Sequence, residues 1–231
     1  MTAPPSDHGR ILDGWRGRLE VIRNEVITAH FHQAVWTAFR DEVQKRRPAA
    51  DGTFLVSYTQ LYVQSQLALV RRLVDPAKST GSLAGLLTSI VANPEVMTRD
   101  RYCSIHEDDG RFAEATWRRA FADPNDPQRL NVSMVAADLE RLTGDLSHLV
   151  AWATRTVAHL DRNKPTRVPR FDELREAIAT IGQVTNTYGE LLARSVTHDW
   201  TPVIQGDWEA VFRPALFPID PRSWNGSDSF S

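Results

Sequence analysis

The stretch VAADLERLTGDLSHLVAWATRTVAHLDR, residues 135–162, is the most informative about the fold because it carries two different helical patterns. Apolar residues recur along it at steps of three and four: Val135, Leu139, Leu142, Leu146, Leu149, Ala153, Val157 and Leu160. This spacing predicts one amphipathic helix of roughly seven turns, with a single apolar face. We expect that face to form part of a hydrophobic core.

A second, polar stripe runs about 100° around the same helix. Its members are Arg141, Asp145, His148, Trp152, Arg155, His159 and Arg162. A polar row beside a core face is typical of a solvated boundary, of a cleft, or of a contact between subunits. The sequence leaves these alternatives open, and the stripe is the first candidate for a functional site.

The composition is that of one globular domain. The chain has 231 residues, of which 42% are hydrophobic and 24% charged, and this length is enough to bury a real core. We place a single α-helical domain at residues 10–215, between a mobile lead at 1–9 and an irregular tail at 216–231. No run of eighteen apolar residues occurs and no signal-peptide segment opens the sequence, so we expect a cytoplasmic protein without a membrane partner.

Charge and cysteine content exclude several classes of function. The formal net charge of −2 argues against a protein that coats nucleic acid through its overall field, so any RNA contact would be local. Cys103 is the only cysteine, which excludes an internal disulfide and a cysteine-built metal site. The pattern Asp145-x-x-His148 only approaches the metal motif of di-iron bundles, and nucleotide-binding loops are absent. We therefore expect no metal and no cofactor.

Helical periodicity recurs through the rest of the chain. It predicts helices at 11–46, 54–74, 83–92 with Ser82 as the N-cap, 112–121, and 171–196. No segment combines strand-length alternation with hairpin residues. The predicted fold class is therefore all-α: a helical bundle whose long central pair, 135–162 and 171–196, runs antiparallel across a short loop.

Arg155 and His159 stand four residues apart and can converge on one bound anion. A histidine can move a proton near neutral pH, and a guanidinium can neutralise a phosphate. Metal-free cleavage of RNA by its own 2′-hydroxyl requires such a pair. A basic loop with Arg162, Lys164 and Arg167 follows, which is either a strip that holds phosphates or a solvated connection that caps the helix.

Several short motifs resemble the HEPN superfamily, and within it the abortive-infection AbiU-like branch. They are Tyr62-Val63-Gln64-Ser65-Gln66 leading to Arg72-Leu73-Val74-Asp75, Ser82-Leu83-x-x-Leu86-Leu87, Val157-Ala158-His159-Leu160-Asp161, and Asp207-Trp208. With the order of elements, the resemblance covers most of residues 10–215. It implies an all-α bundle that is usually dimeric, and many members of the superfamily are metal-independent ribonucleases of toxin or antiphage systems.

The family motif is an arginine separated from a histidine by four to six residues, both facing a cleft between two subunits. The resemblance places His159 at the catalytic histidine, whereas Arg155 departs from the motif because only three residues separate it from His159. Substrate contacts would come from the rest of the stripe and the loop: Arg141, Asp145, His148, Trp152, Arg162, Lys164 and Arg167.

Two functions remain open from the sequence. One is a HEPN-like endoribonuclease of a bacterial toxin–antitoxin or antiviral defence system, which leaves 2′,3′-cyclic phosphate ends. The other is a non-catalytic helical dimer that binds RNA, nucleotide or a protein partner, such as an antitoxin or another defence protein. Both predict a homodimer, and Trp152 is the expected anchor of the contact because a large aromatic ring amid charges is a frequent interface residue.

Overall fold

The computed structural model describes residues 7–46, 52–77, 81–158, 167–203 and 207. Within these ranges the chain is built from helices and short turns, and contains no β-strand. The predicted all-α fold class is confirmed. His159, Arg162, Lys164, the 208–212 segment and the 216–231 tail lie outside the described residues.

Eight α-helices follow one another along the described chain. Their bounds are α1 Asp7–Arg46, α2 Gly52–Val74, α3 Leu83–Ala92, α4 Arg99–Ile105, α5 Arg111–Ala120, α6 Val132–Glu140, α7 Ser147–Ala153 and α8 Phe171–Ala193. Two 3-10 turns, η1 (Pro94–Val96) and η2 (Glu107–Asp109), flank α4, and two π-helical segments, η3 (Arg141–Asp145) and η4 (Thr154–Ala158), flank α7.

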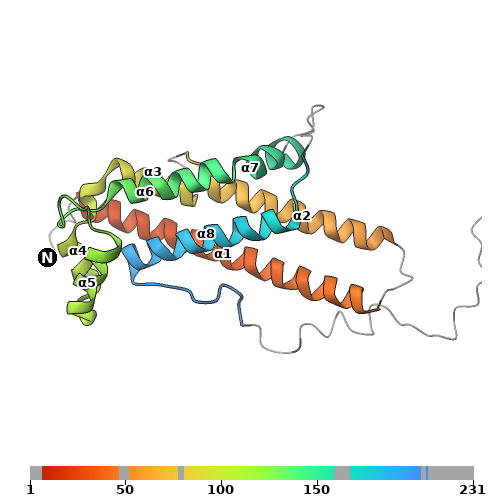
Figure 1. Cartoon of the computed structure of the whole chain (residues 1–231), viewed down its shortest axis with the longest axis horizontal. Coiled ribbons are helices and arrows are strands. Elements are labelled where there is room, and N and C mark those ends of the chain that lie inside the picture. The colour runs from red at the N-terminus through yellow and green to blue at the C-terminus, as the bar shows by residue number, and fades with distance from the viewer. Residues whose placement is uncertain (1–6, 47–51, 78–80, 159–166, 204–206, 208–231) are drawn as a thin grey trace, which may run out of the picture.

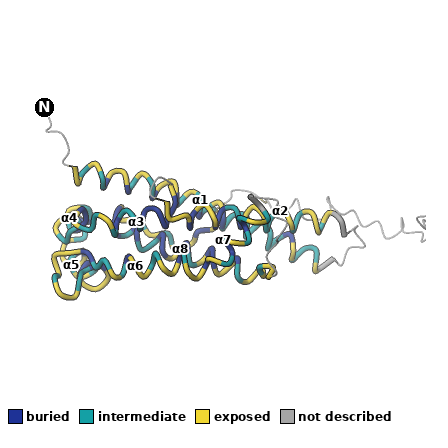
Figure 2. The backbone as a smooth tube through the Cα atoms, turned by 90° about the horizontal axis from the view of Figure 1, so that it is seen from above, coloured by how far each residue is buried: buried dark blue, intermediate teal, exposed yellow. Residues whose placement is uncertain are grey.

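The helices form an elongated bundle (Figure 1). Helix α8 lies along α1 and also contacts α2, while α6 packs on α3 and α7 packs on α2. The short helices α4 and α5 close one end of the bundle, and α7 lies toward the other end (Figure 1). Buried residues line the inner sides of the helices, and exposed residues follow their outer sides (Figure 2). The core includes Trp15, Leu19 and Ile22 of α1, each at most 2% exposed.

Local capping explains where several helices begin. Ser82 caps α3 because its Oγ accepts a hydrogen bond from the Gly85 backbone N–H at 2.9 Å, as predicted. Asn131 caps α6 in the same way, accepting from the Met134 N–H at 3.2 Å. Helix α8 ends at Ala193 because Arg194 adopts the left-handed conformation, with φ of 50°.

The predicted antiparallel pair is present. The Tyr188 hydroxyl donates to Asp138 at 3.0 Å, Arg141 donates to Gln183 at 3.1 Å, and His148 lies 4.0 Å from Glu173. Residue numbers in these pairs rise along α6–α7 and fall along α8. The segment 132–158 therefore runs antiparallel to α8, as its apolar spacing predicted.

The 135–162 segment is nevertheless not one regular α-helix, which corrects the sequence prediction. It begins at Val132, widens into η3, turns at Leu146 and widens again into η4. Gly144 lies within η3, and the hydroxyls of Thr143, Thr154 and Thr156 donate to carbonyls four residues earlier. Such back-bonding hydroxyls compete with the regular backbone pattern and bend helices.

One further boundary differs from the sequence prediction. Helix α1 is a single helix that starts at Asp7, inside the predicted lead at 1–9, where Asp7 forms an ion pair with Arg10. A carboxylate in the first turn is favoured there by the helix dipole. None of the helices in the described part of the chain is both long and apolar enough to cross a bilayer.

Candidate functional site

The polar stripe follows η3, α7 and η4. Arg141 and Asp145 stand exposed in η3, His148 and Trp152 belong to α7, and Arg155 stands exposed in η4. Two of these side chains, those of Arg141 and His148, point to residues of α8. The stripe therefore lies where the α6–α7 segment meets α8, and part of it is exposed to solvent.

His148 is held in one tautomer by its backbone contact. Its Nδ1 lies 3.2 Å from the carbonyl oxygen of Asp145, and because a carbonyl only accepts, Nδ1 carries the hydrogen. In the neutral ring this leaves Nε2 with its lone pair. Nε2 is buried, has no hydrogen-bond partner among the described residues, and lies 4.0 Å from Oε1 of Glu173. Protonation of His148 would therefore place a positive charge beside a carboxylate.

Glu173 organises this part of the site, and the sequence analysis did not single it out. Its carboxylate accepts the Arg170 backbone N–H at 2.8 Å and forms an ion pair with Arg167. The backbone hydrogen bond and the positive charge of Arg167 lower the pKa of Glu173, although partial burial opposes them. The sequence signature of a capping box is absent, because the N-cap residue is Arg170 and not a residue whose side chain can accept a hydrogen bond, so no such signal pointed to Glu173.

Two predicted substrate-binding arginines already have partners within the chain. Arg167 pairs with Glu173, although 67% of its side chain stays exposed, so its guanidinium can exchange this partner for a phosphate. Arg141 donates to Gln183 at 3.1 Å. Both arginines are therefore engaged with residues of α8, Arg141 from the stripe and Arg167 from the loop before α8.

Arg155 differs from these two arginines. Its side chain is exposed and makes no hydrogen bond or ion pair with another residue in the described ranges. It stands in η4, whose backbone bonds join residues five apart and so widen the turn. Single π-helical turns inside α-helices occur frequently at functional sites. This turn directly precedes residue 159, the predicted catalytic histidine.

Trp152 is less exposed than a surface stripe suggests. It is half-buried and packs against the hydrophobic core, and its carbonyl accepts the Thr156 hydroxyl at 2.6 Å. Only part of the indole is therefore available to another molecule. Its role as an interface anchor stays a prediction.

In the ranges that the structure covers, no three His, Cys, Asp or Glu side chains gather closely enough to hold a metal ion. The family model HEPN_AbiU2, described as AbiU2, matches residues 12–211. The chain belongs to the AbiU2 family of HEPN proteins. The comparisons with curated proteins and with solved structures gave no match.

AbiU2 membership confirms the resemblance drawn from the sequence motifs, and it makes this chain an abortive-infection-related HEPN protein. The match spans α2 to α8 and most of α1, so it includes every described residue of the polar stripe.

Proposed function

We propose that this AbiU2 protein is a metal-independent endoribonuclease of a bacterial toxin or antiphage defence system. The observation that carries the proposal is Arg155, an exposed arginine without a partner in the described chain, on the π-helical turn that leads to residue 159. An unpaired guanidinium at such a place is available to a phosphate.

In the proposed reaction His159 removes the proton from a ribose 2′-hydroxyl. The 2′-oxygen then forms a bond to phosphorus, the bond from phosphorus to the 5′-oxygen breaks, and the 5′-oxygen takes up a proton from solvent water as it leaves. Arg155 neutralises the charge that develops on the non-bridging oxygens. The products are a 2′,3′-cyclic phosphate and a 5′-hydroxyl.

The remaining stripe residues would orient the RNA. Arg141, Asp145, His148 and Trp152 lie along one border of the bundle, and Arg162, Lys164 and Arg167 belong to the loop that precedes α8. Arg167 reaches a phosphate in this scheme by leaving Glu173, an exchange that its exposure permits. We further propose a homodimer in which the stripe lies at or beside the contact, with an antitoxin or another defence protein as a regulatory partner.

The direct test is incubation of the purified protein with tRNA and total RNA, with and without EDTA. Cleavage should resist EDTA and leave 2′,3′-cyclic phosphate ends. His159→Ala should lower the rate roughly 10²- to 10⁴-fold, the usual contribution of one positioned acid or base. Arg155→Ala should lower the rate more than Arg141→Ala, because Gln183 already engages Arg141.

A wild-type rate that His159→Ala leaves unchanged, in protein shown to be folded and dimeric, would remove this histidine from the mechanism. The second candidate function is a non-catalytic dimer that binds RNA, nucleotide or protein. One observation favours it: the Glu173 carboxylate is already paired with Arg167, one of the proposed phosphate contacts, and also faces His148. It predicts no cleavage by the wild type, and altered binding alone in the variants.

A further inference from the structure

Helix α5 lies at the end of the bundle opposite α7 (Figure 1) and is attached by only one of its sides. Trp117 is fully buried, packs against the rings of Tyr102 and Phe121, and donates its indole N–H to the Pro127 carbonyl at 2.8 Å. Ala113, one turn earlier, is buried beside it. The other sides of α5 carry its exposed residues.

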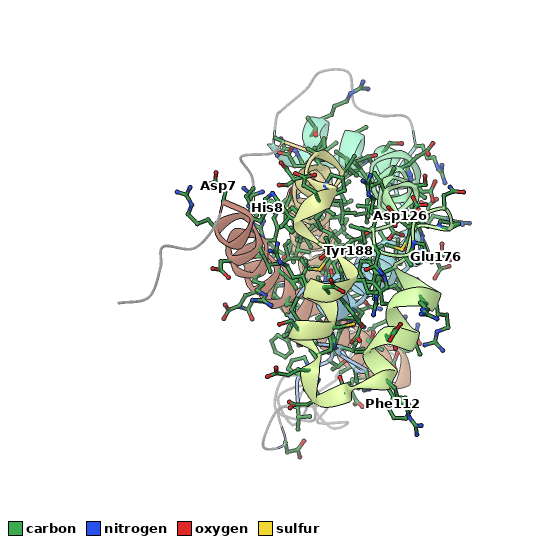
Figure 3. All side chains as sticks on the ribbon, turned by 90° about the vertical axis from the view of Figure 1, so that its left-hand side faces the viewer. Asp7, His8, Phe112, Asp126, Glu176 and Tyr188 are labelled. Carbon is green, nitrogen blue, oxygen red and sulfur yellow. The ribbon has the colours of Figure 1, made fainter. Side chains whose placement is uncertain are left out.

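An aromatic ring and three arginines stand on the exposed part of α5. Phe112 is 67% exposed, and the guanidinium of Arg111 lies over its ring, 5.5 Å from the centroid. Figure 3 shows Phe112 at the edge of the molecule, far from the buried Tyr188. Arg118 and Arg119 follow two turns later and are exposed. We call Arg111, Phe112, Arg118 and Arg119 the α5 patch.

The α5 patch carries excess positive charge. Glu114 is the only acid of the helix, and it is shared between Arg118 at 2.8 Å and Arg99 at 3.6 Å. Arg111 and Arg119 have no carboxylate partner within the described residues. Of the acids in the preceding turn, Asp108 and Asp109 are paired with Arg194 from the end of α8, whereas Glu107 is exposed, so the excess of positive charge belongs to α5 itself. This local excess contrasts with the net charge of −2 for the chain.

The residues of the α5 patch are not explained by a need to stabilise helix α5. Arg118 and Arg119 lie in the last turn, where the helix dipole favours cations, but Arg111 is the first residue, where the dipole disfavours them. An exposed phenylalanine contributes little to folding. A shallow depression of about 590 Å³, lined by Arg111, Glu114, Ala115, Arg118 and Arg119, runs along the same surface.

We propose that the α5 patch binds a single-stranded segment of RNA, an inference that rests on the proposed function for the choice of ligand. Proteins that bind single strands combine aromatic rings, on which bases stack, with cations that hold the phosphates. Phe112 supplies the ring and Arg111 the stacked guanidinium, while Arg118 and Arg119 supply phosphate contacts. The positive charge fits a polyanion, and the exposed ring distinguishes a strand with accessible bases from a duplex.

The distance between the α5 patch and the polar stripe sets the length of the RNA. Glu173 of α8 lies by His148, and Glu190 of the same helix accepts the Tyr102 hydroxyl at 3.0 Å, next to α4 and α5. At 1.5 Å per residue, these two positions lie roughly 26 Å apart along α8. At 3.4 Å per nucleotide, the spacing of stacked bases, a strand of about eight nucleotides contacts both surfaces, and a more extended strand does so with fewer.

The test is fluorescence anisotropy with labelled 2′-O-methyl RNA of about sixteen nucleotides, long enough to span both surfaces and unable to undergo 2′-hydroxyl attack. Phe112→Ala should weaken binding roughly tenfold, the usual loss when one stacked base loses its ring. The double variant Arg111→Gln/Arg119→Gln should make the dependence of log K on log salt shallower by about 1.4. Matched controls are Phe54→Ala, which removes another exposed phenylalanine, and Arg175→Gln, which removes an exposed arginine of α8.

A second readout uses cleavable RNA. Phe112→Ala should raise KM for a substrate of about sixteen nucleotides and leave a substrate of about two nucleotides unaffected, because a dinucleotide cannot span the two surfaces even when extended. If the α5 variants bind RNA as tightly as the wild type, or lose no more affinity than the two controls, the proposed RNA-binding role of the α5 patch is wrong. A wild type that binds no RNA would contradict it as well. Binding that depends on Phe112 in a protein that cleaves nothing would retain the patch and reject the ribonuclease.

Discussion

The Nε2 atom of His148 lies 4.0 Å from Oε1 of Glu173, and this contact joins α7 to the first turn of α8. The same carboxylate binds the Arg170 N–H and the Arg167 side chain. The loop that enters α8, the helix start and the imidazole of the polar stripe are therefore linked through one side chain. A substitution at Glu173 should therefore affect the loop, the start of α8 and the position of the imidazole.

Glu173→Ala should lower the melting temperature at neutral pH, because it removes the acceptor of the Arg170 N–H and the partner of Arg167. The fold lowers the pKa of Glu173 from its ordinary value of 4.5. Its contribution to stability is therefore fully present above that value and is lost as the pH falls through the lower folded pKa. Thermal melts of wild type and variant at about pH 3 and about pH 7 measure this difference.

The matched control is Glu176→Ala, an exposed glutamate three residues later that is labelled in Figure 3. Its effect on the melting temperature should be small at both pH values. If the Glu173→Ala deficit were the same in acid as at neutral pH, the carboxylate would not be the origin of the stabilisation.

Trp152→Glu should weaken self-association by a few kcal/mol if this ring anchors the dimer. Because the indole also packs against the core, Trp152→Phe is needed beside it to retain an apolar contact inside the protomer. Leu61→Glu, at a 63% exposed position on α2, is the control for an added surface charge. Sedimentation at tens of micromolar measures the association, and a strictly monomeric wild type would contradict the proposed homodimer.

Tyr188→Phe should destabilise the fold by about 1–3 kcal/mol, because the Asp138 carboxylate loses its hydroxyl donor inside the α6–α8 contact. Asp138→Asn keeps an acceptor for that hydroxyl and should cost less. Burial raises the pKa of Asp138 above 3.8, although the Tyr188 hydrogen bond and Arg141 oppose this shift. The ionisation of Asp138 therefore lowers the stability of the wild type as the pH rises from 3.8 through the higher folded pKa. Asp138→Asn has no group that ionises there, so it should not show this loss.

Urea unfolding of the three proteins at about pH 4 and about pH 7 separates the hydrogen bond from the charge. The advantage of Asp138→Asn over Tyr188→Phe should be larger at the higher pH. A Tyr188→Phe protein as stable as the wild type would show that the hydroxyl contributes nothing to the contact.

Gly189→Ala should destabilise the fold by about 2 kcal/mol or more, the cost of forcing an added methyl group into packed backbone. A Cβ at Gly189 would lie 2.2 Å from the Ser195 carbonyl oxygen, and the Gly189 carbonyl also accepts the Ser195 N–H at 3.0 Å. Gly14→Ala on α1 is the control, since a Cβ there meets nothing within 4 Å. The control should gain about 0.5–1 kcal/mol from helix propensity. Equal effects of the two substitutions in thermal melts would contradict the close approach.

The helices and their starts were largely predictable because they depend on nearby residues. The apolar spacing placed α3 and the start of α8 within a residue or two, and Ser82 was identified as a cap from its side chain and position alone. The π-helical segments were not predictable in this way. Apolar residues at steps of three and four stay on one face in both an α-helical and a π-helical turn. The pattern therefore does not show which backbone hydrogen bonds form.

The candidate site was likewise predictable only in part. Arg155 and the polar stripe were visible in the sequence as a row on one helix. Glu173 was not, because an acid near a helix start is ordinarily a cap, and nothing in its neighbourhood along the chain shows that His148 will lie beside it. The α5 patch was also missed, since the exposure of Phe112 follows from which side Trp117 anchors.

The all-α class, the main helices, the polar stripe and the AbiU2 resemblance could be read from the sequence alone, because each depends on residue types at fixed short spacings. Which polar groups contact one another depends on the packing of the helices. Those pairs, Tyr188 with Asp138, Arg141 with Gln183 and His148 with Glu173, depend on the register in which α6–α7 pack beside α8. Register is set by the long-range fit of two helix surfaces, and that same fit leaves Arg155 without a partner among the described residues.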